Sequence, residues 1–245
     1  MDLRTSFELF GILIGFLIGF FSYRIFINTR GGSRGWKYIA IGSFSFFVWA
    51  LIQVIFTLIW PLEAIRIFAG FLTWSLIAAL LPLGYMQLNL DFGKEMPRFF
   101  RPKAFLITFG IFWLVLLLIN LIMPFDSILY ELAGISLVTL TVFAWVGGVY
   151  PAYRLWWDSK NWMFLMLFLF VLLIPFGTGL GAYTHGCCFS EDVPACNQIT
   201  TQYANVLYIP CIEGILNIGA YYNLLEMPII LILAAGLIGL WKKLR

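Results

Sequence analysis

Runs of about 20 apolar residues recur along most of this chain and are separated by short polar turns. A helix of about this length crosses the ~30 Å hydrocarbon core of a bilayer, so each run is long enough to span a membrane. The runs predict spans at about residues 7–27, 38–60, 62–90, 104–123, 128–150, 162–180 and 222–241. We therefore expect an all-α integral membrane protein, a bundle of seven transmembrane helices forming one polytopic domain, residues 1–245.

The composition supports the lipid bilayer as the main solvent of the chain. Of the 245 residues, 62% are apolar and only 11% are charged, which is too little charge to cover a soluble domain of this size. The net charge of +3 is small, and no basic patch interleaved with aromatic residues predicts nucleic-acid binding. We expect no nucleic-acid partner and no cofactor.

Proline residues mark most of the predicted turns. Pro61 lies between the second and third runs, and Pro97 and Pro102 lie in the polar stretch after the third run. Pro124 and Pro151 follow the fourth and fifth runs. Because proline has no backbone N–H and its ring clashes with the preceding turn, we expect a helix boundary near each of these positions.

Positive charge is distributed unevenly between the two sides of the predicted bundle. Only Arg4 and Arg66 belong to the N-terminal side. The other 13 of the 15 cations belong to the opposite side: Arg24, Arg30, Arg34, Lys37, Lys94, Arg98, Arg101, Lys103, Arg154, Lys160, Lys242, Lys243 and Arg245. Because cytoplasmic loops retain Lys and Arg, this pattern predicts a multi-pass protein of the cell membrane, with its N-terminus outside and its C-terminus in the cytoplasm.

The stretch 199–225 is long enough to form an eighth span. That count would place Glu213 at mid-membrane and the basic C-terminal tail outside, and both arrangements are energetically unfavourable. We therefore expect one or two short amphipathic helices at the outer surface, in the loop between the sixth and seventh spans.

All four cysteines, Cys187, Cys188, Cys196 and Cys211, lie in or beside this loop, residues 181–221, which the charge pattern places outside the cytoplasm. An even number of clustered thiols in an oxidising compartment predicts disulfides. Adjacent cysteines rarely bond to each other because the geometry is strained, so we expect Cys187 and Cys188 each to pair with one of the other two. The loop is then stabilised by two disulfides.

A metal site is the less favoured alternative for the same residues. His185, Cys187, Cys188 and Cys196 could supply four nitrogen and sulfur ligands of the kind that zinc takes. Their spacing matches no known zinc pattern, and thiols on the oxidising side rarely stay reduced.

The predicted spans contain almost no ionisable residues at mid-depth. Their mid-depth polar residues are uncharged: Gln53, Thr57, Thr73, Ser75, Thr108, Thr139 and Thr141. Such groups usually join helices to one another. One pattern favours a binding site, because Pro82-Leu83-Gly84 and Pro175-Phe176-Gly177 place the same break in the third helix of each three-helix half. Paired helix breaks are typical of transporters, and the site would involve Gln53, Pro82, Pro175 and Gly177.

No catalytic motif is present in the sequence, so we expect a protein that is not an enzyme. The predicted inner loops are too short to form a signalling domain. The sequence therefore favours an accessory or structural subunit of a membrane complex, in contact with other membrane-protein subunits, or a partner-dependent sensor with an external cap. A small-solute transporter is the alternative.

Overall fold

A computed structural model describes residues 3–29, 33–55, 63–122, 128–187 and 222–244. These residues form seven α-helices and one short 3₁₀ helix, and no strand occurs among them. The elements are α1 (Leu3–Asn28), α2 (Arg34–Val54), α3 (Glu63–Asp91), η2 (Arg98–Phe100), α4 (Pro102–Ile122), α5 (Ile128–Ser159), α6 (Trp162–Cys187) and α8 (Tyr222–Leu244). The expected all-helical fold is confirmed for the described part of the chain.

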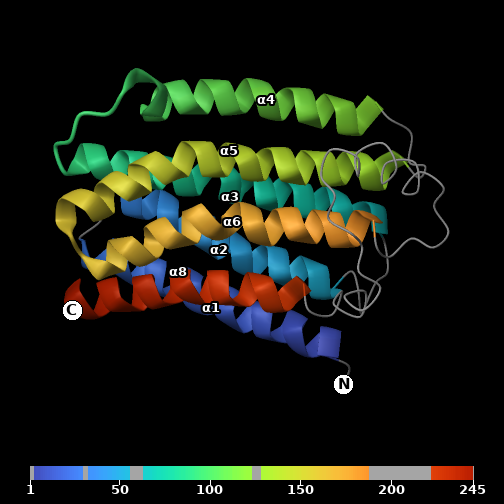
Figure 1. Ribbon diagram of the computed structural model, residues 1–245, viewed down its shortest axis with the longest axis horizontal. Helices are drawn as coiled ribbons and strands as arrows, with labels where there is room; N and C mark the ends of the chain where they lie inside the picture. The colour runs from blue at the N-terminus through green and yellow to red at the C-terminus, as the bar shows by residue number, and fades with distance from the viewer. Residues whose placement is uncertain (1–2, 30–32, 56–62, 123–127, 188–221, 245) are drawn as a thin grey trace.

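The helices form an elongated bundle in which consecutive helices from α1 to α6 run in opposite directions, and the two termini lie at opposite ends (Figure 1). α1 packs on α2 and α8, α3 packs on α2 and α5, and α6 packs on α5 and α8. These contacts close a ring of six helices. α4 lies outside the ring and touches α3 and α5 over small areas.

Three of the described helices contain stretches that are long and apolar enough to cross a bilayer, Leu9–Asn28, Arg34–Ile52 and Phe68–Asp91. Two further apolar helical stretches, Pro102–Leu118 and Trp162–Ile174, are shorter. Their length and composition indicate a membrane protein. The predicted outer loop falls mainly on residues 188–221, so its amphipathic helices lie outside the described residues.

Two helices continue beyond their predicted ends. α5 passes through Pro151 and ends at Ser159, so the expectation that the helix ends at Pro151 is wrong. In a bundle, neighbouring helices can supply contacts that keep a proline-containing helix intact. Pro151 is buried, and its carbonyl accepts a hydrogen bond from the Asn89 side chain of α3 at 2.9 Å. α6 likewise continues past 180, to Cys187.

Glycines allow α1 to approach α2 closely. A Cβ added at Gly15 would lie 2.9 Å from the backbone N and Cα atoms of Phe47, closer than real Cβ contacts. Gly11 and Gly19, one turn to either side, also face α2. Small residues spaced by four allow the backbones of membrane helices to pack against each other, which explains the broad contact between these two helices.

Candidate functional site

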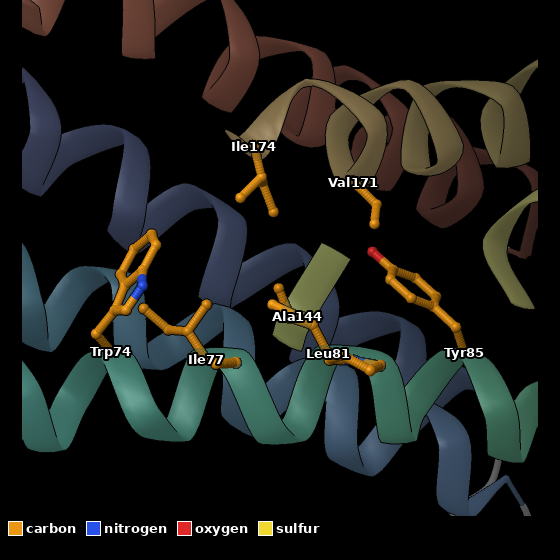
Figure 2. A pocket seen from close by; sticks show the side chains of 9 residues that line it. Trp74, Ile77, Leu81, Tyr85, Ala144, Val171 and Ile174 are labelled. Carbon is orange, nitrogen blue, oxygen red and sulfur yellow. The ribbon is translucent and has the colours of Figure 1, made fainter. Parts of the chain in front are cut away.

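A small cavity lies at the junction of α3, α5 and α6 (Figure 2). It is lined by Trp74, Ile77, Ala78, Leu81, Pro82 and Tyr85 of α3, Ala144 of α5, and Val171 and Ile174 of α6. The room for the centre of a water molecule is about 10 Å³, which is near the lower limit for holding one water. The cavity therefore accommodates a ligand of the size of a single water molecule.

Tyr85 supplies the unpaired polar group of this cavity. Its side chain is fully buried, and Figure 2 shows its hydroxyl pointing across the cavity toward Val171. The hydroxyl oxygen has no hydrogen-bond partner among the protein atoms that the structure describes. Leaving a buried hydroxyl unpaired costs about 1–3 kcal/mol, so such groups normally bind protein or water. This hydroxyl is therefore positioned to stabilise a hydrogen-bonding ligand.

Two tryptophan indoles join α3 to neighbouring helices near the cavity. Trp74 Nε1 donates to Thr141 Oγ1 of α5 at 3.1 Å, and Trp113 Nε1 of α4 donates to Ser75 Oγ at 2.9 Å. Ser75 and Thr141 thus join helices, as expected for uncharged polar residues at mid-depth. The hydroxyl of Thr73, by contrast, bonds to carbonyls of its own helix.

An aromatic contact extends from the cavity wall to α2. The ring of Phe46 meets Trp74 edge-on at a centroid distance of 5.9 Å and meets Phe170 of α6 at 6.0 Å. Edge-to-face pairs at such distances are favourable. Phe46 and Phe170 are both buried but lie outside the cavity lining, so the cavity is enclosed by packed side chains.

Asn89, one turn after Tyr85, connects α3 to α5. Its Nδ2 donates to the Tyr85 carbonyl at 2.8 Å and to the Pro151 carbonyl at 2.9 Å, and the residue is fully buried. Both hydrogens of the amide are therefore used. The bond to the Tyr85 carbonyl orients the amide on α3, and the bond to the Pro151 carbonyl joins α3 to α5 at the level where α5 passes its proline.

The end of α3 is attached to the start of α2 by the carboxylate of Asp91. Its Oδ2 accepts hydrogen bonds from Ser33 Oγ at 2.7 Å and from the Gly35 backbone N at 3.3 Å. Its Oδ1 accepts from Gln87 Nε2 at 2.8 Å. A carboxylate at a helix N-terminus is favoured by the exposed N–H groups and the helix dipole, so Asp91 stabilises the first turn of α2.

Ionic contacts join the loop between α3 and α4 to the end of α5. Lys94 Nζ lies 2.8 Å from Asp158 Oδ2, and the Arg154 guanidinium lies 3.8 Å from the same oxygen. Arg154 also donates to the Glu95 carbonyl at 2.9 Å. The hydrogen bond from Lys94 and the surrounding positive charges lower the pKa of Asp158. Asp158 therefore remains ionised at neutral pH.

The residues that the sequence singled out fall only partly within the described structure. Pro82 is buried and lines the cavity. The side chains of Gln53, Pro175 and Gly177 lie outside the described residues, although Ile174, next to Pro175, lines the same cavity.

The proposed disulfide and metal residues cannot be placed relative to one another. The helical backbone of α6 includes His185 and ends at Cys187, but the side chains of both are outside the described residues. Cys188, Cys196 and Cys211 also lie outside. The two disulfides and the alternative metal site therefore stay predictions.

The sequence analysis did not single out Tyr85, Asn89 or Asp91. A signal for two of them exists, because Tyr85 and Asn89 are four residues apart in the part of the helix that follows Pro82. Polar groups spaced in this way lie on one helix face. Comparisons with protein-family models, curated proteins and solved structures found no match to this chain.

Proposed function

We propose that this chain is a non-enzymatic, multi-pass subunit of a membrane complex and that α4 binds a transmembrane helix of a partner protein. The observation that carries the proposal is the position of α4 outside the ring of six helices (Figure 1). Helices in a bilayer gain no hydrophobic energy from leaving lipid, so a specific interface needs complementary side chains. The outer face of α4 has a pattern of this kind.

The four most exposed large hydrophobic residues of α4 follow a heptad. Ile107, Ile111, Leu114 and Leu118 are separated by four, three and four residues, and their exposed fractions are 65%, 62%, 53% and 53%. This is the spacing of the a and d positions of a coiled coil, in which Ile and Leu side chains insert between those of a second helix. The row is therefore suited to packing against a partner helix.

The described interior also supports a subunit without chemistry of its own. Apart from buried aromatic residues such as Tyr85, its buried polar residues are serines, threonines and one asparagine: Ser22, Ser43, Ser45, Thr73, Ser75, Asn89 and Thr141. Among the residues whose burial the structure describes, none of the buried ones is a carboxylate or an amine, the groups that mark ion and proton pathways in membrane proteins.

The distribution of cations supports the proposed orientation. Cationic side chains at the end of the bundle that holds the C-terminus include Arg24, Arg34, Lys37, Lys94, Arg98, Arg101, Lys103, Arg154, Lys160, Lys242 and Lys243. We propose that this end, called the basic end below, faces the cytoplasm, that seven helices span the cell membrane, and that the loop 181–221 is extracytoplasmic.

Site-specific photo-crosslinking in native membranes tests the subunit proposal. A benzophenone amino acid replaces Leu114 on α4 or, as the matched control, Leu13 on α1, whose exposed fraction is 54% against 53% for Leu114. We expect a discrete protein adduct at position 114 and none at position 13. Lipid adducts alone at both positions would contradict the proposal.

The small-solute transporter remains the second candidate function, and one observation favours it. Pro82 of α3 and Ile174, beside Pro175 of α6, line the same cavity. Transport would require α3 and α6 to separate there, because the cavity has room for about one water molecule. Proteoliposomes containing the purified protein test this function: solute uptake that a Pro82→Ala variant loses would support transport.

A further inference from the structure

We propose that the cavity between α3, α5 and α6 is a binding site for one water molecule, which bridges the Tyr85 hydroxyl and two backbone carbonyls. The first argument is the hydroxyl itself. Tyr85 is completely buried, points into the cavity, and has no partner among the described protein atoms (Figure 2). Buried polar groups of this kind are normally paired with protein or ordered water.

The second argument comes from the prolines of α3 and α6. Because proline has no N–H, the carbonyl four residues earlier loses its usual helical partner. Pro82 deprives Ala78 of this partner, and Pro175 deprives Val171. Both Ala78 and Val171 line the cavity, so each proline frees a carbonyl of a residue that lines it.

These groups match the requirements of a buried water. Such a water typically makes about three hydrogen bonds, and in the proposed arrangement it accepts one from the Tyr85 hydroxyl and donates one to each of the carbonyls of Ala78 and Val171. The room of about 10 Å³ fits one water and excludes larger ligands. The other polar group in the lining, Trp74 Nε1, is already bonded to Thr141.

The bound water would join α3 to α6 at their proline positions. Gly148 of α5 packs into the same crossing, since a Cβ added there would lie 2.9 Å from Val171 Cγ1 and 3.8 Å from Pro82 Cγ. Waters and neighbouring helices commonly satisfy the backbone groups that proline frees in membrane helices. The inference does not depend on the proposed partner of α4.

X-ray hydroxyl-radical footprinting of the full-length protein in detergent tests the proposal, since radicals form from bound water and oxidise adjacent side chains. Tyr23, which is 54% exposed, is the positive control, and Phe170, which is 1% exposed and outside the cavity lining, is the negative control. We expect Tyr85 to be oxidised at a rate comparable to that of Tyr23. A rate as low as that of Phe170 would overturn the proposal.

The Tyr85→Phe variant gives an independent readout. If water pairs with the hydroxyl, its removal leaves the water with fewer partners, and the midpoint of thermal unfolding falls by about 2–4 °C. If the hydroxyl is unpaired, the midpoint instead rises, because removing the hydroxyl relieves the cost of burying an unpaired polar group. A rise in the midpoint would therefore overturn the proposal. Tyr23→Phe is the matched control and leaves the midpoint unchanged.

Discussion

The two three-helix halves of the chain, α1–α3 and α4–α6, carry the same Pro-apolar-Gly sequence in their third helices but pack differently. The expectation that this sequence breaks the helices is wrong, because α3 and α6 both continue through it. In the first half, α1 packs along α2 and α2 packs along α3. In the second half, α5 packs along α6, whereas α4 lies outside the ring (Figure 1). A short sequence match in the third helices is therefore not accompanied by the same packing of the first.

Small residues account for the difference between α1 and α4. Gly15 of α1 lies so close to Phe47 that an added Cβ would clash with the backbone of α2. Gly110, at the corresponding place in the middle of α4, has nothing within 4 Å of an added Cβ. Without a hydrophobic driving force between membrane helices, such close approach decides which helices associate. α1 is fixed by its own chain, whereas α4 keeps an exposed face, which binds another chain on the proposed function.

The largest expected effect is the difference in stability between alanine substitutions at these two glycines. Gly15→Ala places a methyl group against a backbone that cannot move aside, and we expect it to destabilise the fold by about 1–3 kcal/mol. Gly110→Ala meets no atoms and removes a flexible residue from a helix, so it should be neutral or stabilise by up to about 1 kcal/mol. Thermal unfolding in detergent measures both. Equal losses from the two variants would refute the comparison.

The difference in stability loss expected between the two indole variants is smaller than that between the two glycine variants, about 1–2 kcal/mol. Trp74→Phe removes the bond to Thr141 from the packed interior, and we expect it to lower stability by about 2–3 kcal/mol, the sum of a lost buried bond and lost packing. Trp113→Phe removes the bond to Ser75 at the loosely packed α4, with an expected loss of about 1 kcal/mol. The same thermal measurement ranks them. The reverse order would mean that α4 is held as firmly as the ring.

The smallest effect concerns the ionic contacts after α3. The pKa of Asp158 is lowered in the folded state, so its stabilising contribution is complete above its ordinary value of 3.8 and disappears as the pH falls through the lowered folded value. Because the pair with Lys94 is partly exposed, we expect Lys94→Ala to cost less than about 1 kcal/mol at pH 7.

A pH series of thermal unfolding checks this assignment. The difference between wild type and Lys94→Ala should vanish at pH values below the folded pKa of Asp158, where the carboxyl is neutral. Lys103→Ala, at an exposed position in the first turn of α4, removes the same charge and serves as the control. A loss from Lys94→Ala that persists in acid would rule out the ionic explanation.

The helices themselves could be predicted because the length of an apolar run is a local property. α3 spans Glu63–Asp91 where the sequence predicts 62–90, and α8 begins at Tyr222, as predicted. Pro151 was misinterpreted because its rule describes an isolated helix. In the bundle, α5 continues through Pro151 to Ser159, and Asn89 of α3 donates a hydrogen bond to the Pro151 carbonyl.

The site could be predicted only in part. The Pro82-Leu83-Gly84 pattern directed attention to the region of the cavity, but the role of Tyr85 depends on the rotation of α3 and on the position of α6 beside it. Neither is encoded in the local pattern. The contacts of Asp91 join residues separated by 56 and 58 positions, so they could not be predicted from spacing alone.

The continuation of α5 through Pro151 gives the molecule a marker of its depth in the membrane. With 32 residues, α5 is about 48 Å long, against about 30 Å of hydrocarbon. On the proposed topology, its last turns emerge at the basic end, where Trp157 is half-exposed and lies 3.1 Å from Lys160 Nζ, measured to the ring centroid. Such an aromatic and cationic pair prefers the headgroup layer. The end of α5 would thus anchor at the headgroup layer and set the depth of the whole bundle in the bilayer.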